Sequence, residues 1–289
     1  MLFAVGCVIV GVSVVGGFLG AGGHVHVLWQ PFEFLIIFGS ALGAFIIANP
    51  PAVLVGTLKS FKHLIAGASH NQAAYLELLS ALYAILKLAK TKGDLALEAH
   101  IDRPEESALF QAFPRFARNA TAMEFLCDYL RLLTLGTTKP HEMEAVMDAE
   151  IEAHRAEHES VCHALQVCAD GLPALGIVAA VLGVIHTMGS ITEPPEILGQ
   201  LIGGALVGTF TGVLASYGLV APVAKAIEGK FSAETDYLEC IKASLIAHTQ
   251  GYAPQVSVEF ARKIIRSKIR PSFNELDEAL QTVPAEATA

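Results

Sequence analysis

Two prolines and two hydroxyls lie in the most apolar part of the chain. Thr209 and Ser216 are seven residues apart in an uncharged run, so they share one face of a helix. Pro173 and Pro222 each lack an N–H and free a carbonyl four residues earlier, which weakens a helix at that point. The spacing predicts that the two hydroxyls face protein or water rather than lipid, and the two prolines, placed at a similar depth, predict a hinge.

Ionisable side chains are missing from the middle of these runs. Glu33 and Asp170 lie at their edges, and His186 lies in the outer third of its run. Since intramembrane carboxylates mark ion paths, a conducting site here must borrow a carboxylate from a partner. The sequence has no Gly-x-Ser-x-Gly elbow, Gly-rich phosphate loop or acid pair, so an enzyme is not predicted.

The elements that position these residues are four uncharged blocks, at 1–32, 34–58, 171–192 and 197–224. Each can cross a bilayer, which takes about 20 apolar residues. Overlapping Gly-x-x-x-Gly spacings in the last block predict close helix packing; they involve Gly199, Gly203, Gly204, Gly208 and Gly212. We therefore predict an all-α integral membrane protein with four transmembrane helices, a helical cytoplasmic loop domain and a cytoplasmic tail.

The distribution of basic residues predicts which segments lie on the cytoplasmic side of the membrane. Of the 19 Lys and Arg residues, eleven lie in 51–168 and eight in 225–289, and none in the short connections. The positive-inside rule then places both long segments and both termini in the cytoplasm. The predicted parts are a transmembrane hairpin (1–50), a cytoplasmic loop (51–168), the two ion-path spans (169–224) and a cytoplasmic tail (225–289).

Helical patterns fill the cytoplasmic segments. We predict a bundled helix over 71–92, a helix over 114–135, and a helix from Pro140 that continues through the third span as one rod of about 50 residues. Three histidines on this rod could suggest a metal site: His154, His158 and His163. We interpret the first two as packing residues and the third as solvated, so no metal or other cofactor is predicted.

The net charge and the local basic residues also limit which partners the sequence predicts. A net charge of −9 gives no support for a nucleic-acid partner. Five basic residues in 262–270 fit either contact with anionic membrane lipid or a solvated basic face.

Five segments carry a resemblance to a known family. They are LPALGIVAAVLGVIHTMGS (172–190), VGTFTGVLASYGLVAPVA (207–224), GYAP (251–254), VEFARK (258–263) and RPSFNELDEAL (270–280). Together they resemble the MotA family of bacterial flagellar stator subunits. The resemblance implies a multi-pass protein of the bacterial inner membrane in which five subunits surround two MotB-type partners. A partner aspartate takes up the coupling proton, and the cytoplasmic loop pushes on the rotor protein FliG.

The resemblance also assigns roles to residues. The family's functional prolines fall on Pro173 and Pro222, and its pore threonine on Thr209. Sodium-driven relatives have a second hydroxyl at the position of Ala180, which cannot ligate a cation, so proton use is implied. Rotor-contacting charges fall on three residues of the loop, namely Lys90, Glu98 and Glu150. Many relatives have Arg in place of Lys90, and Lys keeps the charge without the planar donor pair.

Two other functions remain open at this point. One is an ExbB- or TolQ-like energiser of outer-membrane transport, although such proteins usually have three spans. The other is a membrane scaffold that conducts nothing.

Overall fold

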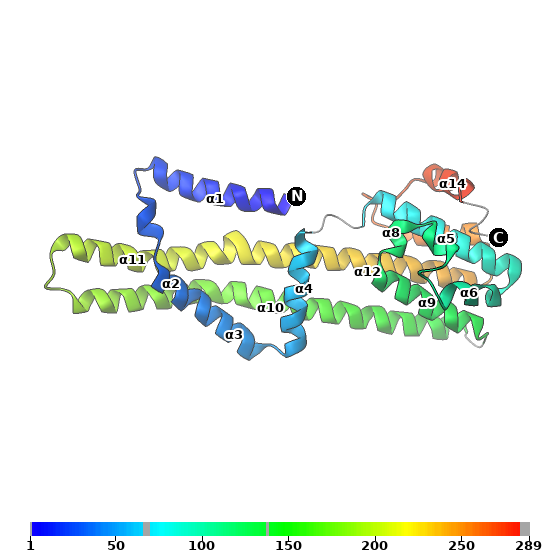
Figure 1. Ribbon diagram of the computed structural model, residues 1–289, viewed down its shortest axis with the longest axis horizontal. Helices are drawn as coiled ribbons and strands as arrows, with labels where there is room; N and C mark the ends of the chain where they lie inside the picture. The colour runs from blue at the N-terminus through cyan, green and yellow to red at the C-terminus, as the bar shows by residue number, and fades with distance from the viewer. Residues whose placement is uncertain (1, 66–69, 137–138, 284–289) are drawn as a thin grey trace. The chain divides into compact units, whose positions relative to one another are not determined.

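The computed structural model describes residues 2–65, 70–136 and 139–283, and it divides the chain into two compact units (Figure 1). Unit 1 comprises Met1–Gly67 and Ala156–Lys230, and unit 2 comprises Ala68–Arg155 and Phe231–Ala289. The described residues form helices and connections and include no strand, which confirms the predicted all-α class.

Unit 1 begins with short and medium helices. They are α1 (Leu2–Gly20), η1 (Val25–Leu28), α2 (Pro31–Phe34), the π-helical turn η2 (Leu35–Gly39), α3 (Ser40–Ala48) and α4 (Pro51–Ile65). Many apolar side chains of α1 and α3 are exposed. A surface of this kind is typical of helices that face lipid or a partner helix.

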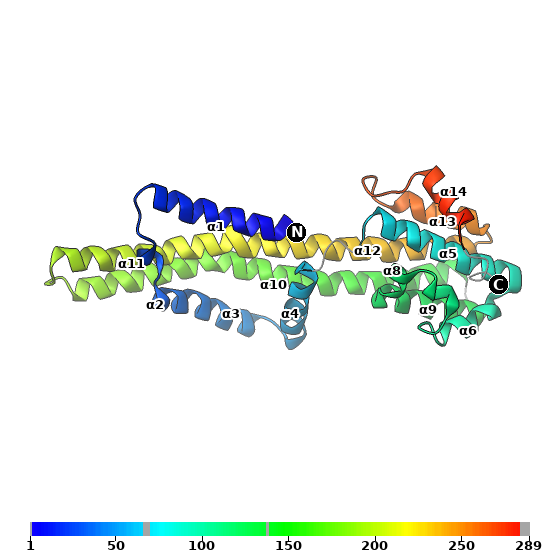
Figure 2. The same ribbon diagram turned by 45° about the horizontal axis from the view of Figure 1, so that its top comes forward.

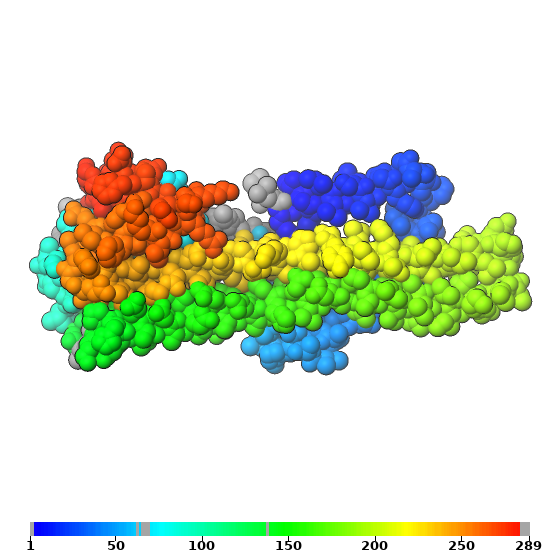
Figure 3. Space-filling view, turned by 180° about the vertical axis from the view of Figure 1, so that it is seen from behind, coloured from blue at the N-terminus to red at the C-terminus, as the bar shows by residue number. Residues whose placement is uncertain are grey.

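Two long helical runs pass through both units. Helix α10 (Pro140–Gly189) is continuous over 50 residues, as predicted. The second run consists of α11 (Pro195–Val213), a π-helical segment η4 (Leu214–Val220) and α12 (Ala221–Thr249). Within unit 1, α10 and α11 lie side by side in Figures 1 and 2, and their surfaces meet in Figure 3.

Unit 2 has a conventional hydrophobic core around α5 (Gln72–Lys92). Asn71 caps this helix by accepting a hydrogen bond from the Ala74 N–H, and Gly93 ends it with a φ of 86°. The remaining helices of the unit are η3 (Asp94–Leu97), α6 (Glu98–Ile101), α7 (Ala108–Gln111), α8 (Pro114–Ala117), α9 (Ala120–Thr134), α13 (Pro254–Ile264) and α14 (Phe273–Gln281). The predicted 71–92 helix is therefore confirmed.

Among the described residues, five helical runs are long and apolar enough to cross a membrane. For α5, 72% of its most apolar window is buried inside the protein, against at most 28% for each of the other four. The apolar residues of α5 are thus covered by its own unit, and we interpret α5 as a core helix. The other four correspond to the blocks recognised in the sequence.

The predicted helix over 114–135 is wrong in its boundaries. The chain forms a single turn, α8, and restarts as α9 at Ala120. Asn119 lies between them in an extended conformation, and its side-chain oxygen accepts a hydrogen bond from the Ala122 N–H. A competing side-chain cap of this kind interrupts a run that periodicity alone would continue.

Arg262 ties two of the recognised motifs together in unit 2. Its guanidinium donates two hydrogen bonds to the Glu259 carboxylate, at 2.6 and 2.7 Å, and a third to the Pro271 carbonyl at 2.9 Å. The Arg262 side chain is 8% exposed. Hydrogen bonding to Arg262 lowers the pKa of Glu259. The VEFARK segment thereby holds the RPSF segment in place.

Replacing Arg262 by Met should lower the free energy of unfolding of unit 2 by about 2 kcal/mol, because three charged hydrogen bonds are lost. The depressed pKa of Glu259 means that this stabilisation is present above the ordinary carboxyl pKa and disappears as the pH falls through the lowered value. Urea unfolding of the solubilised full chain measures it. Lys263→Met, on the same helix with a 64% exposed side chain, is the control. Equal midpoints for the two variants at neutral pH would contradict the prediction.

Candidate functional site

Glycines bring α10 and α11 into backbone contact. A Cβ atom built on Gly212 would lie 2.6 Å from the Leu172 carbonyl oxygen, and one on Gly176 would lie 2.8 Å from the Gly208 carbonyl oxygen. We call Gly176, Gly208 and Gly212 the glycine contact. It confirms the predicted packing role for Gly208 and Gly212. At Gly199, in contrast, an added Cβ meets no described atom within 4 Å.

Thr209 and Ala180 are placed together by this contact. A Cβ on Gly176 would lie 3.3 Å from the Thr209 Cα, and one on Gly208 would lie 3.2 Å from the Ala180 backbone nitrogen. The two candidate ion-path residues therefore occupy neighbouring levels of adjacent helices. Ser216, within η4, is fully buried, and its hydroxyl has no hydrogen-bond partner among the described residues.

The helix distorts where a soft point was predicted in the fourth span. Segment η4 directly precedes Pro222, and after it the Ala221 N–H donates to the carbonyl of Ser216, five residues earlier. A wider turn relieves the clash between a proline ring and the preceding turn, and π-helical segments recur at functional sites. Helix α10, in contrast, passes through Pro173 without a break.

The expectation that both prolines lie at a similar depth is wrong. Leu172 lies against Gly212, which is ten residues before Pro222, or roughly 15 Å along a helix. Pro173 is therefore level with the start of η4, and Pro222 lies beyond its end. The ends of the apolar blocks do not fix this register, because it is set by which glycines of α10 and α11 touch.

Glu33 has a more central position than the sequence predicts. The sequence places Glu33 at the edge of a span, whereas its side chain lies between α10 and α11. Cβ atoms built on Gly183 and Gly208 would lie 3.2 and 3.0 Å from its two carboxylate oxygens. Oε2 is buried and has no hydrogen-bond partner among the described residues. Glycines on both facing helices were the signal that could have indicated space for this carboxyl.

The candidate rotor-binding charges lie in unit 2. Lys90, in the last turn of α5, and Glu98, at the start of α6, are both exposed, and the chain between them includes the buried Leu97. Asp94 lies between them, 3.9 Å from the Nε2 atom of His248. Burial lowers the pKa of His248, Asp94 opposes this shift, and the positive charge of Lys90 adds to it. Lys90, Asp94 and Glu98 thus place charges of both signs along the segment that ends α5 and begins α6.

Glu150 differs from the other two. Its carboxylate accepts a 2.6 Å hydrogen bond from the Tyr129 hydroxyl, and the residue is half-buried. Burial and this hydrogen bond raise the pKa of Tyr129. The structure thus gives Glu150 a hydrogen-bond partner within its own unit.

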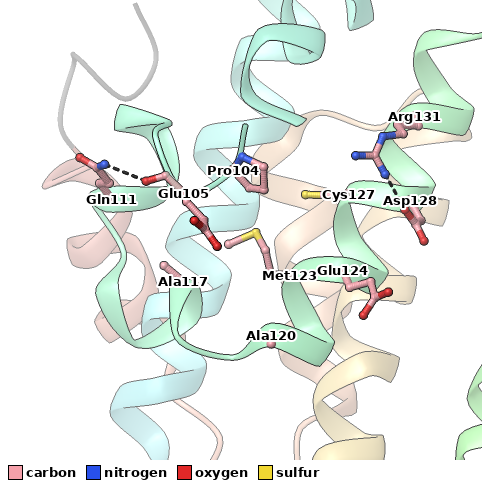
Figure 4. A pocket seen from close by; sticks show the side chains of 10 residues that line it. All are labelled: Pro104, Glu105, Gln111, Ala117, Ala120, Met123, Glu124, Cys127, Asp128 and Arg131. Carbon is pink, nitrogen blue, oxygen red and sulfur yellow. Dashed lines mark hydrogen bonds and ion pairs between the residues drawn. The ribbon is translucent and has the colours of Figure 1, made fainter. Parts of the chain in front are cut away.

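A cavity of about 400 Å³ in unit 2 is lined by several charged side chains and by Cys127 (Figure 4). Arg131 pairs with Asp128 at 2.7 Å, and the Gln111 amide donates to the Glu105 carbonyl. Burial raises the pKa of Cys127 to about 11, so its thiol is not a nucleophile at neutral pH.

The histidines of α10 do not form a metal centre. His154 and His158 are half-buried and His163 is exposed, in agreement with the predicted packing and solvated roles. Across the described part of the chain, no group of three or more His, Cys, Asp or Glu side chains could hold a metal ion.

Comparisons with known proteins agree over almost the whole chain. Two family models match, "Motility protein A N-terminal" over residues 4–93 and "MotA/TolQ/ExbB proton channel family" over residues 115–240. Motility protein A of Salmonella typhimurium and that of Escherichia coli are each 40% identical over 98% of this chain and 96% of their own length. The chemotaxis protein LafT of Vibrio parahaemolyticus is 36% identical over 93% of this chain and 94% of its own length.

Solved structures share the fold. A chain of the C. jejuni MotAB structure matches with a TM-score of 0.74 at 22% identity, covering 94% of this chain and 98% of that one. A chain of the flagellar MotAB stator complex from Bacillus subtilis matches with a TM-score of 0.69 at 23% identity, covering 96% and 98%.

Proposed function

The chain belongs to the motility protein A family, and we propose how this subunit of a flagellar stator proton channel turns proton flow into torque. The protein is a channel subunit and not an enzyme. In the proposal, α10 and α11 line one side of the proton path at Thr209 and Ala180. Pro173, η4 and Pro222 form a soft region that bends as the path changes its protonation state.

The glycine contact is the observation that carries this proposal. It holds two helical backbones in direct contact at the level of Thr209, so a change in one helix is transmitted to the other. One charge that crosses the membrane releases roughly 2.3 kcal/mol per 100 mV. That energy is enough to shift the populations of two packed arrangements. Ala180 supplies no ligand for a desolvated cation, which favours protons over sodium.

The proposed topology has four spans in the bacterial inner membrane. They are α1, the run from α2 to α3, the unit 1 part of α10, and the run from α11 to the start of α12. Both termini and unit 2 then lie in the cytoplasm, which agrees with the distribution of Lys and Arg. Trp29, 70% exposed between the first two spans, would anchor the outer interface. Lys263 of α13 and Lys268 in the segment after it are exposed and are the proposed contacts with lipid head groups, whereas Arg262 is held by Glu259 and Pro271.

The proposed assembly is a homopentamer around two MotB-type single-span partners, whose aspartate takes up the proton near Thr209. The two solved MotAB structures support a partner of this kind. FliG is the proposed rotor partner, and the turn with Lys90 and Glu98 is the proposed contact. Glu150 is a weaker candidate because Tyr129 already engages its carboxylate.

The first experiment measures rotation of tethered cells that lack their own stator and carry this chain with its candidate partner. Rotation should survive removal of sodium and stop when a protonophore is added. A stable membrane complex that never turns would contradict a role in torque generation. It would favour an outer-membrane energiser or a non-conducting scaffold. Proton flux that is lost when the partner aspartate is changed to Asn would then distinguish the energiser from the scaffold.

Reversing both rotor-facing charges, Lys90→Glu with Glu98→Lys, should reduce swimming at least severalfold, because opposite charges guide and hold the rotor contact. Compensating reversals on the rotor should restore it, which swimming speed measures. Glu105→Lys, outside this turn, is the control. Normal swimming by the double reversal would mean that the two charges are only solvated surface groups.

A further inference from the structure

A polar pocket opens beside Glu33 in unit 1. It has a volume of about 590 Å³, and four polar side chains line it: Gln30, Glu33, His186 and Gln200. They come from α10, α11, and α2 with the residue before it, in a part of the chain otherwise rich in apolar groups. We call it the outer pocket. In the proposed topology it faces away from the cytoplasm.

The facing helices are shaped to hold the polar groups of this pocket. Gly183 and Gly208 leave the space that the Glu33 carboxyl fills, and Gly204 lies under the Gln30 amide, where a Cβ would be 3.3 Å from Nε2. Alanine at these positions would crowd the side chains. The carboxyl is thus seated in a fitted recess.

The recess covers one oxygen of the half-buried Glu33 side chain. Oε2 is buried without a hydrogen-bond partner among the described residues. An isolated charge in an apolar environment is costly, so a buried carboxylate oxygen gains by binding a proton or by accepting a hydrogen bond from water. The titratable side chain that shares the pocket is His186, from α10.

The recess also adjoins the proposed proton path. Oε2 lies against Gly208, the residue before Thr209, and a Cβ on Gly208 would in addition lie 3.2 Å from the Ala180 nitrogen. From these positions we infer that Glu33 is a proton-accepting site of this chain, which takes protons from water in the outer pocket and passes them on toward the level of Thr209. The step is a reversible protonation: the Glu33 carboxylate binds a proton and later releases it, and no other bond forms or breaks.

This inference rests on the proposed function and is tested on the full complex of this chain with its single-span partner in lipid vesicles. Proton uptake driven by a potassium diffusion potential is followed with a pH-sensitive dye. Glu33→Gln keeps the shape and loses the proton site, so flux at alkaline outer pH should fall roughly tenfold or more. The defect should shrink at acidic outer pH, where protons are abundant. Glu33→Asp should retain part of the flux.

Glu196→Gln is the matched control, since Glu196 is exposed in the first turn of α11 and does not line the pocket. Flux within twofold of the parent for Glu33→Gln at every outer pH, with the complex intact, would overturn the inference. A parent complex whose flux does not depend on the partner carboxyl would overturn the proposed function and this inference with it. Flux that depends on the partner but not on Glu33 would overturn the inference alone.

A second measurement does not depend on flux. Infrared difference spectra of the parent complex between acidic and alkaline outer pH should contain a carboxylic C=O band. Glu33→Gln should remove that band, or isotope labelling of glutamate should shift it. A carboxylic C=O band of equal intensity in the parent and in Glu33→Gln would overturn the inference.

Discussion

Valine in place of Gly212 is expected to separate α10 from α11 and to remove most of the folded protein from the membrane complex. Even the first added carbon would lie 2.6 Å from the Leu172 carbonyl oxygen and 2.9 Å from the Gly176 Cα. Both are backbone atoms, which cannot rotate away. Overpacking of a well-fitted interior costs about 1–3 kcal/mol where side chains adjust, and a rigid backbone leaves less room for adjustment.

Gly199→Val is the matched control for this prediction. Gly199 lies in the same helix, so the helix-propensity cost of a β-branched residue is similar, yet no described atom lies within 4 Å of an added Cβ. The two variants are compared by thermal unfolding of the solubilised chain and by the amount that co-purifies with the partner. Equal melting temperatures and equal recovery would show that the glycine contact is not needed for packing.

The elements that sequence analysis predicted well are those with long, uninterrupted patterns. Helix α5 has a capping residue, strong helix formers and a terminal glycine, and α10 has an apolar stripe that no turn signal interrupts before the third span. The buried positions of that stripe include Met143, Met147 and Ile151. Local signals were enough here because they agree with each other over many turns.

The misplaced features depend on contacts that are distant in sequence. The level of Pro173 relative to Pro222 is set by which glycines of α10 and α11 touch, and periodicity within one helix contains no such register. Glu33 was read as a span-edge residue for the same reason, since its recess is formed by Gly183 and Gly208 on other helices. The break at Asn119 is different, because a side-chain cap competes locally with helix continuation.

The corrected register changes how the prolines can act. Pro173 is level with the beginning of η4, so the weak point in α10 faces a segment that is already wider than an α-helix. Pro222 closes that segment on the cytoplasmic side in the proposed topology. The soft region is therefore one continuous zone across two helices, and it lies directly beyond the level of Thr209.

Replacing Pro173 by Ala is then expected to stop torque while the complex still assembles. Alanine restores the missing hydrogen bond to the Ala169 carbonyl and stiffens α10 opposite η4. The roughly 2.3 kcal/mol released per charge and 100 mV would no longer drive the bend. Rotation of tethered cells measures torque, and co-purification with the partner measures assembly.

The control is Pro195→Ala, at the first position of α11, where proline replaces no helical hydrogen bond. This variant should rotate like the parent. Rotation of the Pro173→Ala variant at the parental speed would contradict the bending mechanism, because α10 would then work equally well without its weak point. Loss of both rotation and assembly would make Pro173 a packing residue instead. The soft region would then be confined to η4 and Pro222, whose replacement by Ala would become the test of the bend.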